Sequence, residues 1–132
     1  MDHENHASIE DKAKSALNEF PSDSDEHFTQ RAMRAARLVP EMERRVGQLT
    51  RARHTLAKLF RIAERSIRRA QFIYTIPEIA VIVLDGRVVI DTAEKIMKNT
   101  RHAGVEVLMV AWLAASPKDR EAFMVKFQLK RA

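Results

Sequence analysis

Apolar side chains recur every seven residues along a basic stretch of the chain, and this period constrains the fold more than any other feature. One heptad position holds Val39, Val46, Arg53, Phe60 and Ile67, and the position three residues later holds Met42, Leu49, Leu56, Ala63 and Ala70. We call these ten residues the seam. A seam sustained over more than four heptads is typical of a long helix that pairs with another helix in a coiled coil. It predicts a mainly α protein that forms a homodimer through this helix.

Two features modify this interpretation. Pro40 would be costly inside a helix, so we expect a break or kink near Leu38, with a shorter helix before it. Arg53 occupies a seam position, where it would weaken a simple hydrophobic dimer, while Leu59 and Ile62 widen the apolar surface. The wider surface predicts that the helix also packs against the rest of its own chain.

Cationic side chains lie opposite the seam in this register. They are Arg37, Arg44, Arg51, Lys58 and Arg65 at one heptad position, flanked by His54, Arg61 and Arg68 at a second. We call this set the cationic ridge. Because the ridge faces away from the seam, the helix can bury its apolar side without burying charge. The ridge is therefore either a solvated surface or a contact surface for an anionic partner.

The net charge of +5 is unevenly distributed along the 132 residues. Residues 1–30 carry two Lys and eight acids, residues 31–70 carry twelve Lys or Arg and three Glu, and residues 71–132 carry nine cations and seven acids. Three acids cannot neutralise twelve cations within one segment. This imbalance favours contact with a polyanion such as nucleic acid.

We divide the chain into an acidic flexible arm at 1–26 and a single helical domain at 27–132. Within the arm, Ser8 and Asp11 have the spacing of a helix N-cap, and a short apolar stripe follows before Pro21. A helix of this length is marginal alone in water, so we expect it to form only against a partner or its own domain.

The domain divides further into a long basic helix region at 27–76, a β-hairpin at 77–91 and C-terminal helices at 92–132. The hairpin is predicted because β-branched residues flank Asp85-Gly86, a dipeptide that two-residue hairpin turns prefer. The alternative is a buried helix through the same residues, which Gly86 would interrupt.

Helix signals return after the predicted hairpin. Asp91 and Glu94 have capping-box spacing, so a helix should start at Asp91 and continue to about Ala115. Ser116 and the proline after it predict a last helix from Pro117 to about Leu129. A helix-turn-helix within 92–129 is compatible with the sequence, although no motif indicates it.

Several classes of function are disfavoured. The chain has no cysteine, which fits a reducing compartment, and its longest apolar run, Val107 to Ala115, is nine residues. No nucleophile with a base, glycine-rich phosphate loop or metal-ligand spacing is evident, so we expect no enzyme, no cofactor and no metal site. We expect a cytoplasmic protein that does not bind membranes.

The leading hypothesis is a nucleic-acid-binding accessory or regulatory protein whose arginines contact phosphates, with DNA as the expected ligand. The residues predicted to make this contact are Arg44, Arg51, Lys58, Arg61, Arg65, Arg68 and Arg69. The alternative is a coiled-coil interaction or assembly module, in which the seam and the C-terminal helices bind another protein chain.

Overall fold

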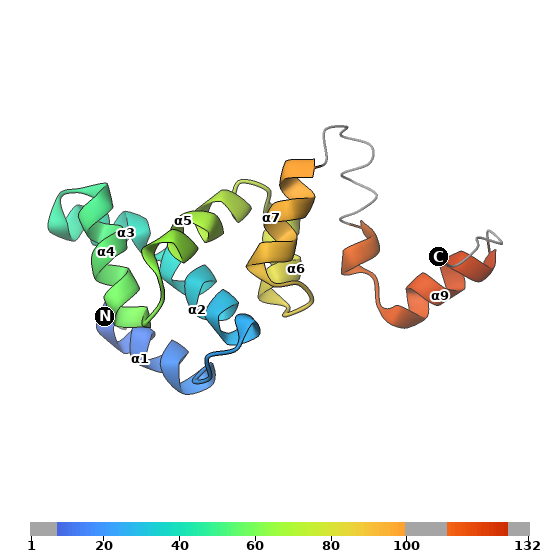
Figure 1. Ribbon diagram of the computed structural model, residues 1–132, viewed down its shortest axis with the longest axis horizontal. Helices are drawn as coiled ribbons and strands as arrows, with labels where there is room; N and C mark the ends of the chain where they lie inside the picture. Colours follow the sequence, from blue (N-terminus) through green and yellow to red (C-terminus); the bar gives the residue numbers. More distant parts are fainter. Residues whose placement is uncertain (1–7, 100–110, 127–132) are drawn as a thin grey trace, which may run out of the picture.

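The computed structural model describes residues 8–99 and 111–126 (Figure 1). All regular secondary structure in these ranges is helical, which confirms the mainly α class. The helices are α1 (Ile9–Glu19), α2 (Asp25–Arg37), α3 (Val39–Val46), α4 (Leu49–Phe60), α5 (Glu64–Ile73), α6 (Pro77–Leu84), α7 (Ile90–Asn99) and α9 (Pro117–Lys126).

Helix α2 is the centre of the fold, because it contacts α1, α3, α4, α5 and α6. Small side chains let the neighbouring helices approach it closely, and Ala32 and Ala35 are fully buried. Two buried polar residues join it to the later helices. The Gln30 side-chain amide donates to the Val83 carbonyl at 2.8 Å, and the Thr29 hydroxyl accepts from the Ile90 amide at 3.1 Å.

Helix α1 confirms the short helix predicted in the N-terminal segment. The Ser8 hydroxyl accepts a 3.0 Å hydrogen bond from the Asp11 amide, as the N-cap spacing indicates. Ile9, Ala13 and Ala16 are buried in the main hydrophobic core, where α1 packs against α4 and α2. This part of the predicted arm therefore lies against the domain, which supplies the apolar surface that a short helix needs.

The prediction of one long helix beyond Pro40 is wrong. Residues 39–73 form three helices, α3, α4 and α5, while the break expected near Leu38 is confirmed. Gly47 ends α3 in a left-handed conformation at φ 81°, with its amide bonded to the Glu43 carbonyl at 2.7 Å. Arg61 ends α4 in the same way at φ 52°. The seam period survives because each short helix buries its own apolar stripe against its neighbours.

The predicted β-hairpin is also wrong, and the helical alternative is observed. Helix α6 starts at Pro77 and ends at Leu84, and Gly86 beyond it adopts a φ of 79°. The Gly86 amide donates to Val83 and the Arg87 amide to Ile82, the paired bonds of a Schellman motif. Asp85-Gly86 thus ends a helix. Ile79, Ile82 and Val83 before it are buried, and burial on one side of a short helix offsets their weak helix propensity.

Helix α7 begins one residue before the predicted cap. Val89 supplies the first carbonyl, to the Ala93 amide at 3.0 Å, so Asp91 lies inside the first turn and is not the N-cap. Residues 100–110, through which this helix was expected to continue, lie outside the described residues, as do 127–132. The start of α9 is confirmed, because the Ser116 hydroxyl accepts from the Asp119 amide at 3.0 Å.

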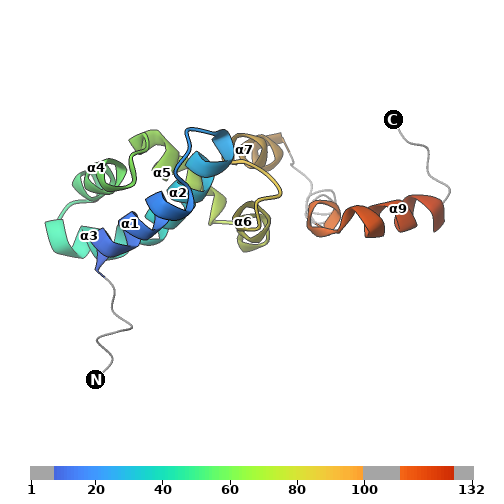
Figure 2. The same ribbon diagram turned by 90° about the horizontal axis from the view of Figure 1, so that it is seen from below.

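Helix α9 lies apart from helices α1 to α7 in both ribbon views (Figures 1 and 2). Among the helices of the described ranges, none combines the length and the apolar character needed to cross a bilayer.

Candidate nucleic-acid interface

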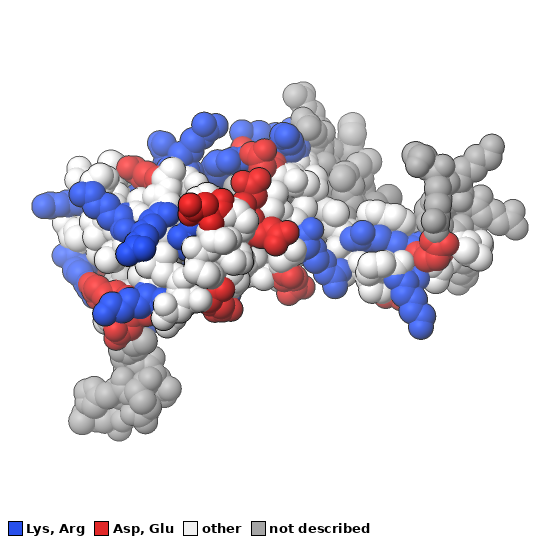
Figure 3. Space-filling view, turned by 60° about the horizontal axis from the view of Figure 1, so that its bottom comes forward, with Lys and Arg blue, Asp and Glu red and all other residues white. Residues whose placement is uncertain are grey.

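The seven cations predicted to contact nucleic acid are spread over three helices and one turn. Arg44 lies on α3, Arg51 and Lys58 on α4, Arg61 in the turn after it, and Arg65, Arg68 and Arg69 on α5. The ridge therefore does not run along a single rod. On the face drawn in Figure 3, Lys and Arg side chains are interspersed with Asp and Glu side chains.

Helices α4 and α5 and the turn between them bring six of these cations into one helix–turn–helix unit. The two helices are joined by residues 61–63 and run in different directions from that turn (Figure 1). Leu56 and Phe60 of α4 and Ile67 and Ile73 of α5 are fully buried, so each helix turns its apolar side inward. The cations consequently project outward, and Arg51, Lys58, Arg61, Arg65 and Arg68 are all exposed.

The turn itself depends on the backbone of Arg61. Its amide donates to Lys58 and the following amide of Ile62 donates to Ala57 at 3.0 Å, so α4 ends in a Schellman motif. This motif normally has glycine at the left-handed position. With arginine there, a cationic side chain is exposed at the corner between the two helices. Lys58, Arg61 and His54 border a shallow depression of about 540 Å³ at this corner.

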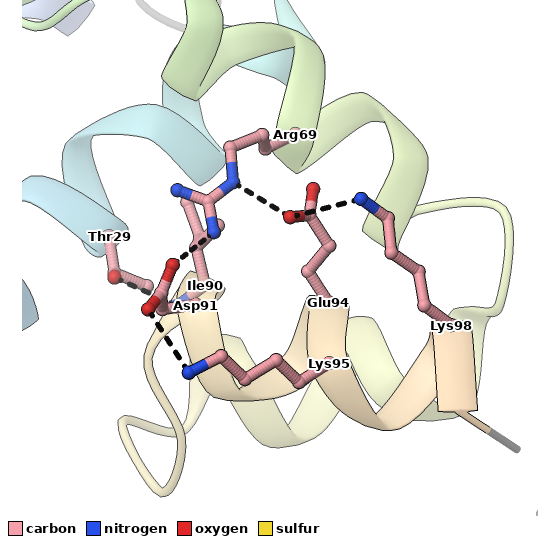
Figure 4. Close-up of polar contacts among 7 residues, drawn as sticks. All are labelled: Thr29, Arg69, Ile90, Asp91, Glu94, Lys95 and Lys98. Atoms are coloured by element: carbon pink, nitrogen blue, oxygen red, sulfur yellow. Dashed lines mark hydrogen bonds and ion pairs between the residues drawn. The ribbon is translucent and has the colours of Figure 1, made fainter.

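Arg69 differs from the other predicted residues because carboxylates of α7 bind it (Figure 4). Its guanidinium donates to Asp91, and its Nε lies 3.2 Å from a Glu94 carboxylate oxygen. Lys95 and Lys98 approach the same two carboxylates at 3.8 and 3.5 Å. Arg69 therefore joins α5 to α7, and the two acids that were interpreted as a capping box serve this contact.

The ion pair also shifts the protonation of its members. Hydrogen bonding to Arg69 lowers the pKa of Asp91, and the positive charge of Lys95 acts in the same direction. The hydrogen bond that Arg69 donates to Asp91 raises the pKa of Arg69, which keeps the guanidinium charged. Arg69 is thus a structural cation in this arrangement.

Several other cations of the basic segment are also held by neighbours. Arg45 pairs with Glu10 at 2.8 Å, and Arg53 donates to the Gln71 side chain at 2.8 Å. By contrast, Arg44, Arg51, Lys58, Arg61, Arg65 and Arg68 make no ion pair with any carboxylate in the parts of the chain that the structure describes. Within the α4–turn–α5 unit, Glu64 is the sole acid, and it lies 4.0 Å from His54.

The sequence did not reveal this helix pair because the turn lacks glycine. Two seam residues that do not fit a buried heptad position lie where the two helices meet. Arg53 occupies a core position of the heptad pattern but bonds to Gln71 on α5, and Ala63, also a seam residue, is exposed in the turn.

The described residues contain no cluster of His, Cys, Asp or Glu suited to a metal ion. Comparisons with models of protein families, with curated proteins and with solved structures found no match to this chain.

Proposed function

We propose that this protein is a cytoplasmic accessory or regulatory factor that binds double-stranded DNA through α4, the turn and α5. The observation that carries the proposal is the helix–turn–helix unit with five exposed cations that lack an acidic partner in the described chain. In DNA-binding proteins with such a pair, the second helix enters the major groove and the first crosses the backbone.

The roles of the cations follow from their positions. Arg65 and Arg68 lie three residues apart in the first half of α5, so both point from the outer side of the helix that would enter the groove. Arginine there can donate two parallel hydrogen bonds to a phosphate or to a guanine edge. Arg51 and Lys58 on α4 and Arg61 in the turn would contact phosphates, which fixes orientation without reading sequence.

A double charge reversal tests the proposal. Arg65→Glu with Arg68→Glu should reduce affinity for a random-sequence duplex by about a hundredfold or more at moderate salt, because two phosphate contacts become repulsive. The fold should survive, since both sites are exposed and glutamate is favourable near a helix start.

The matched control is Lys12→Glu with Lys118→Glu, which changes the net charge equally on α1 and α9. Fluorescence anisotropy with a labelled duplex should show a much smaller effect for this control. Equal losses for the two double variants would mean that only net charge matters, and absence of binding by the unmodified protein would reject the proposal.

A second candidate function is binding to another protein chain, including a second copy of this one. The seam does not favour it, since Val39, Met42, Leu56, Phe60 and Ile67 are buried in the chain's own core. Two exposed apolar side chains do favour it, because Phe72 is 39% exposed and Val81 is 57% exposed. Light scattering of the unmodified protein and of Phe72→Ser with Val81→Ser tests this candidate. A decrease in molecular mass on substitution would support an interface between copies.

A further inference from the structure

Arg31 of α2 is a buried cation without an acidic partner. The residue is 2% exposed, and no carboxylate oxygen lies within 4.0 Å of its guanidinium among the described residues. Its Nη2 donates to the Ser22 carbonyl at 3.3 Å, its Cζ lies 4.7 Å from the Phe28 ring centre, and its Nε has no hydrogen-bond partner. Buried charges are normally paired, because removing a charge from water is very unfavourable.

The contacts of Arg31 do not account for this burial. A guanidinium has five N–H donors, and one carbonyl satisfies one of them. The Phe28 ring adds a cation–π contact, which supplies no acceptor for the remaining donors. An acceptor-rich anion would provide what the protein does not.

Arg31 lines a pocket of about 430 Å³, and two further cationic side chains line the same pocket. Lys14 of α1 and Arg61 of the α4–α5 turn line the same pocket, together with the amide side chain of Asn18. Asp23 is the one acid among the lining residues. Three cations from three separate segments thus line one cavity, with a single carboxylate among the lining residues.

We infer that this pocket binds a phosphate group. A phosphate dianion balances the excess of two positive charges and offers enough acceptor oxygens for the Arg31 fork, Lys14 and Arg61. A carboxylate would leave part of that charge and several donors unmatched. The group is either a free phosphate or phosphomonoester, whose dianion balances the full excess, or a phosphodiester of the DNA backbone, whose single charge balances half of it. The second source is considered because Arg61 lies at the corner of the proposed DNA interface.

Thermal unfolding of the full chain tests the site without DNA. The reference sample contains chloride at the same ionic strength. When the concentration of inorganic phosphate is tenfold above its Kd, we expect the midpoint of thermal unfolding to be higher by about 5 °C than in chloride. Arg31→Met, which keeps the volume and removes the charge, should abolish this rise. Arg37→Met is the matched control, because Arg37 lies on the same helix outside the pocket and should leave the rise intact.

A milder pair of variants covers the case in which Arg31→Met alters the fold. Lys14→Met should weaken phosphate binding several-fold, whereas Lys12→Met, an exposed change on the same helix that does not line this pocket, should not. Equal midpoints in phosphate and chloride for the unmodified protein would overturn the inference. The inference would also fail if phosphate raised the midpoint of Arg31→Met as much as that of Arg37→Met, or if it bound Lys14→Met as tightly as Lys12→Met.

A competition experiment identifies the source of the phosphate. If DNA supplies it, inorganic phosphate at constant ionic strength should displace a labelled duplex, and Arg31→Met should weaken DNA binding about tenfold. If the ligand is free, phosphate and DNA should bind together and Arg31→Met should bind DNA normally. Failure of the unmodified protein to bind DNA rejects the proposed function alone, because the unfolding experiment contains no DNA.

Discussion

The backbone amide of Ile62 donates a 3.0 Å hydrogen bond to the carbonyl oxygen of Ala57, and this bond closes the carboxyl end of α4. It forms only because the intervening Arg61 adopts a left-handed conformation at φ 52°. For an L-residue other than glycine, that conformation costs about 1–2 kcal/mol. The turn that separates α4 from α5 therefore contains local strain at a residue whose side chain lies in the proposed DNA interface.

Replacing Arg61 with glycine should separate stability from binding. Arg61→Gly should raise the free energy of unfolding by about 0.5–1 kcal/mol, because relief of strain exceeds the entropy that glycine adds to the unfolded chain. The same change should weaken DNA binding a few-fold, because one phosphate contact is lost. Urea unfolding and fluorescence anisotropy measure the two effects. Arg68→Gly removes the same charge from within α5, so it should instead lower stability by about 1 kcal/mol. Destabilisation by both changes would contradict the strain at Arg61.

The Arg69–Asp91 contact should make stability sensitive to acid. Arg69 lowers the pKa of Asp91, so the unfolded chain binds a proton at this carboxyl at a higher pH than the folded chain does. The contribution of the pair is therefore complete above the unfolded pKa of about 4 and is lost as the pH falls through the lower folded value. Asp91→Asn should flatten the decrease in thermal midpoint below about pH 4, and DNA affinity at neutral pH should remain unchanged.

The neighbouring lysine offers a control for this effect. Lys95→Met removes a more exposed cation that lies 3.8 Å from Asp91 and leaves the Arg69 contact in place. Most of the acid sensitivity should therefore persist in that variant. An Asp91→Asn profile that overlies that of the unmodified protein would show that the pair contributes nothing to the pH dependence.

Local helix signals in this sequence were correct where a serine hydroxyl caps the first turn. Ser8 and Ser116 cap helices as their spacing indicates, and Pro117 starts a helix, whereas Asp91 lies inside the first turn of α7 despite its capping-box spacing. A cap satisfies an amide within the same turn, so its effect needs no tertiary contact.

Signals that depend on packing were ambiguous. The heptad period arises equally from one long helix and from three short helices that each bury an apolar stripe. An arginine at position 61 also gives no indication of a left-handed turn, for which glycine is the usual residue. Likewise, nothing local separates Arg31, which is buried, from Arg37, which is exposed on the same helix. Arg31 is buried because Ser22 and residues of α1 lie around it. The sequence pattern of α2 alone carries no information about these neighbours.

Salt dependence should report how many cations contact phosphate. If Arg51, Lys58, Arg61, Arg65 and Arg68 all do so, log affinity should fall against log salt with a slope of about −4.5. Lys58→Ala should reduce the magnitude of that slope by about 1. Arg69→Met should leave it unchanged, because Asp91 and Glu94 already hold that guanidinium. A slope near zero for the unmodified protein would exclude phosphate contacts as the basis of binding.

Two adjacent residues at the end of α6, Asp85 and Gly86, distinguish the observed helix from the predicted hairpin. A two-residue hairpin turn would require positive φ at both Asp85 and Gly86, whereas the observed helix end has Asp85 at φ −72° and only Gly86 at φ 79°. Gly86→Ala should therefore lower the free energy of unfolding by about 1 kcal/mol from backbone strain alone, since a Cβ there would meet no atom within 4 Å. Asp85→Ala should be neutral or slightly stabilising, because it removes an exposed negative charge from the carboxyl end of a helix. Urea unfolding of the two variants measures both effects. If they proved equally destabilising, both residues would need positive φ, and the helical assignment of 77–84 would fail.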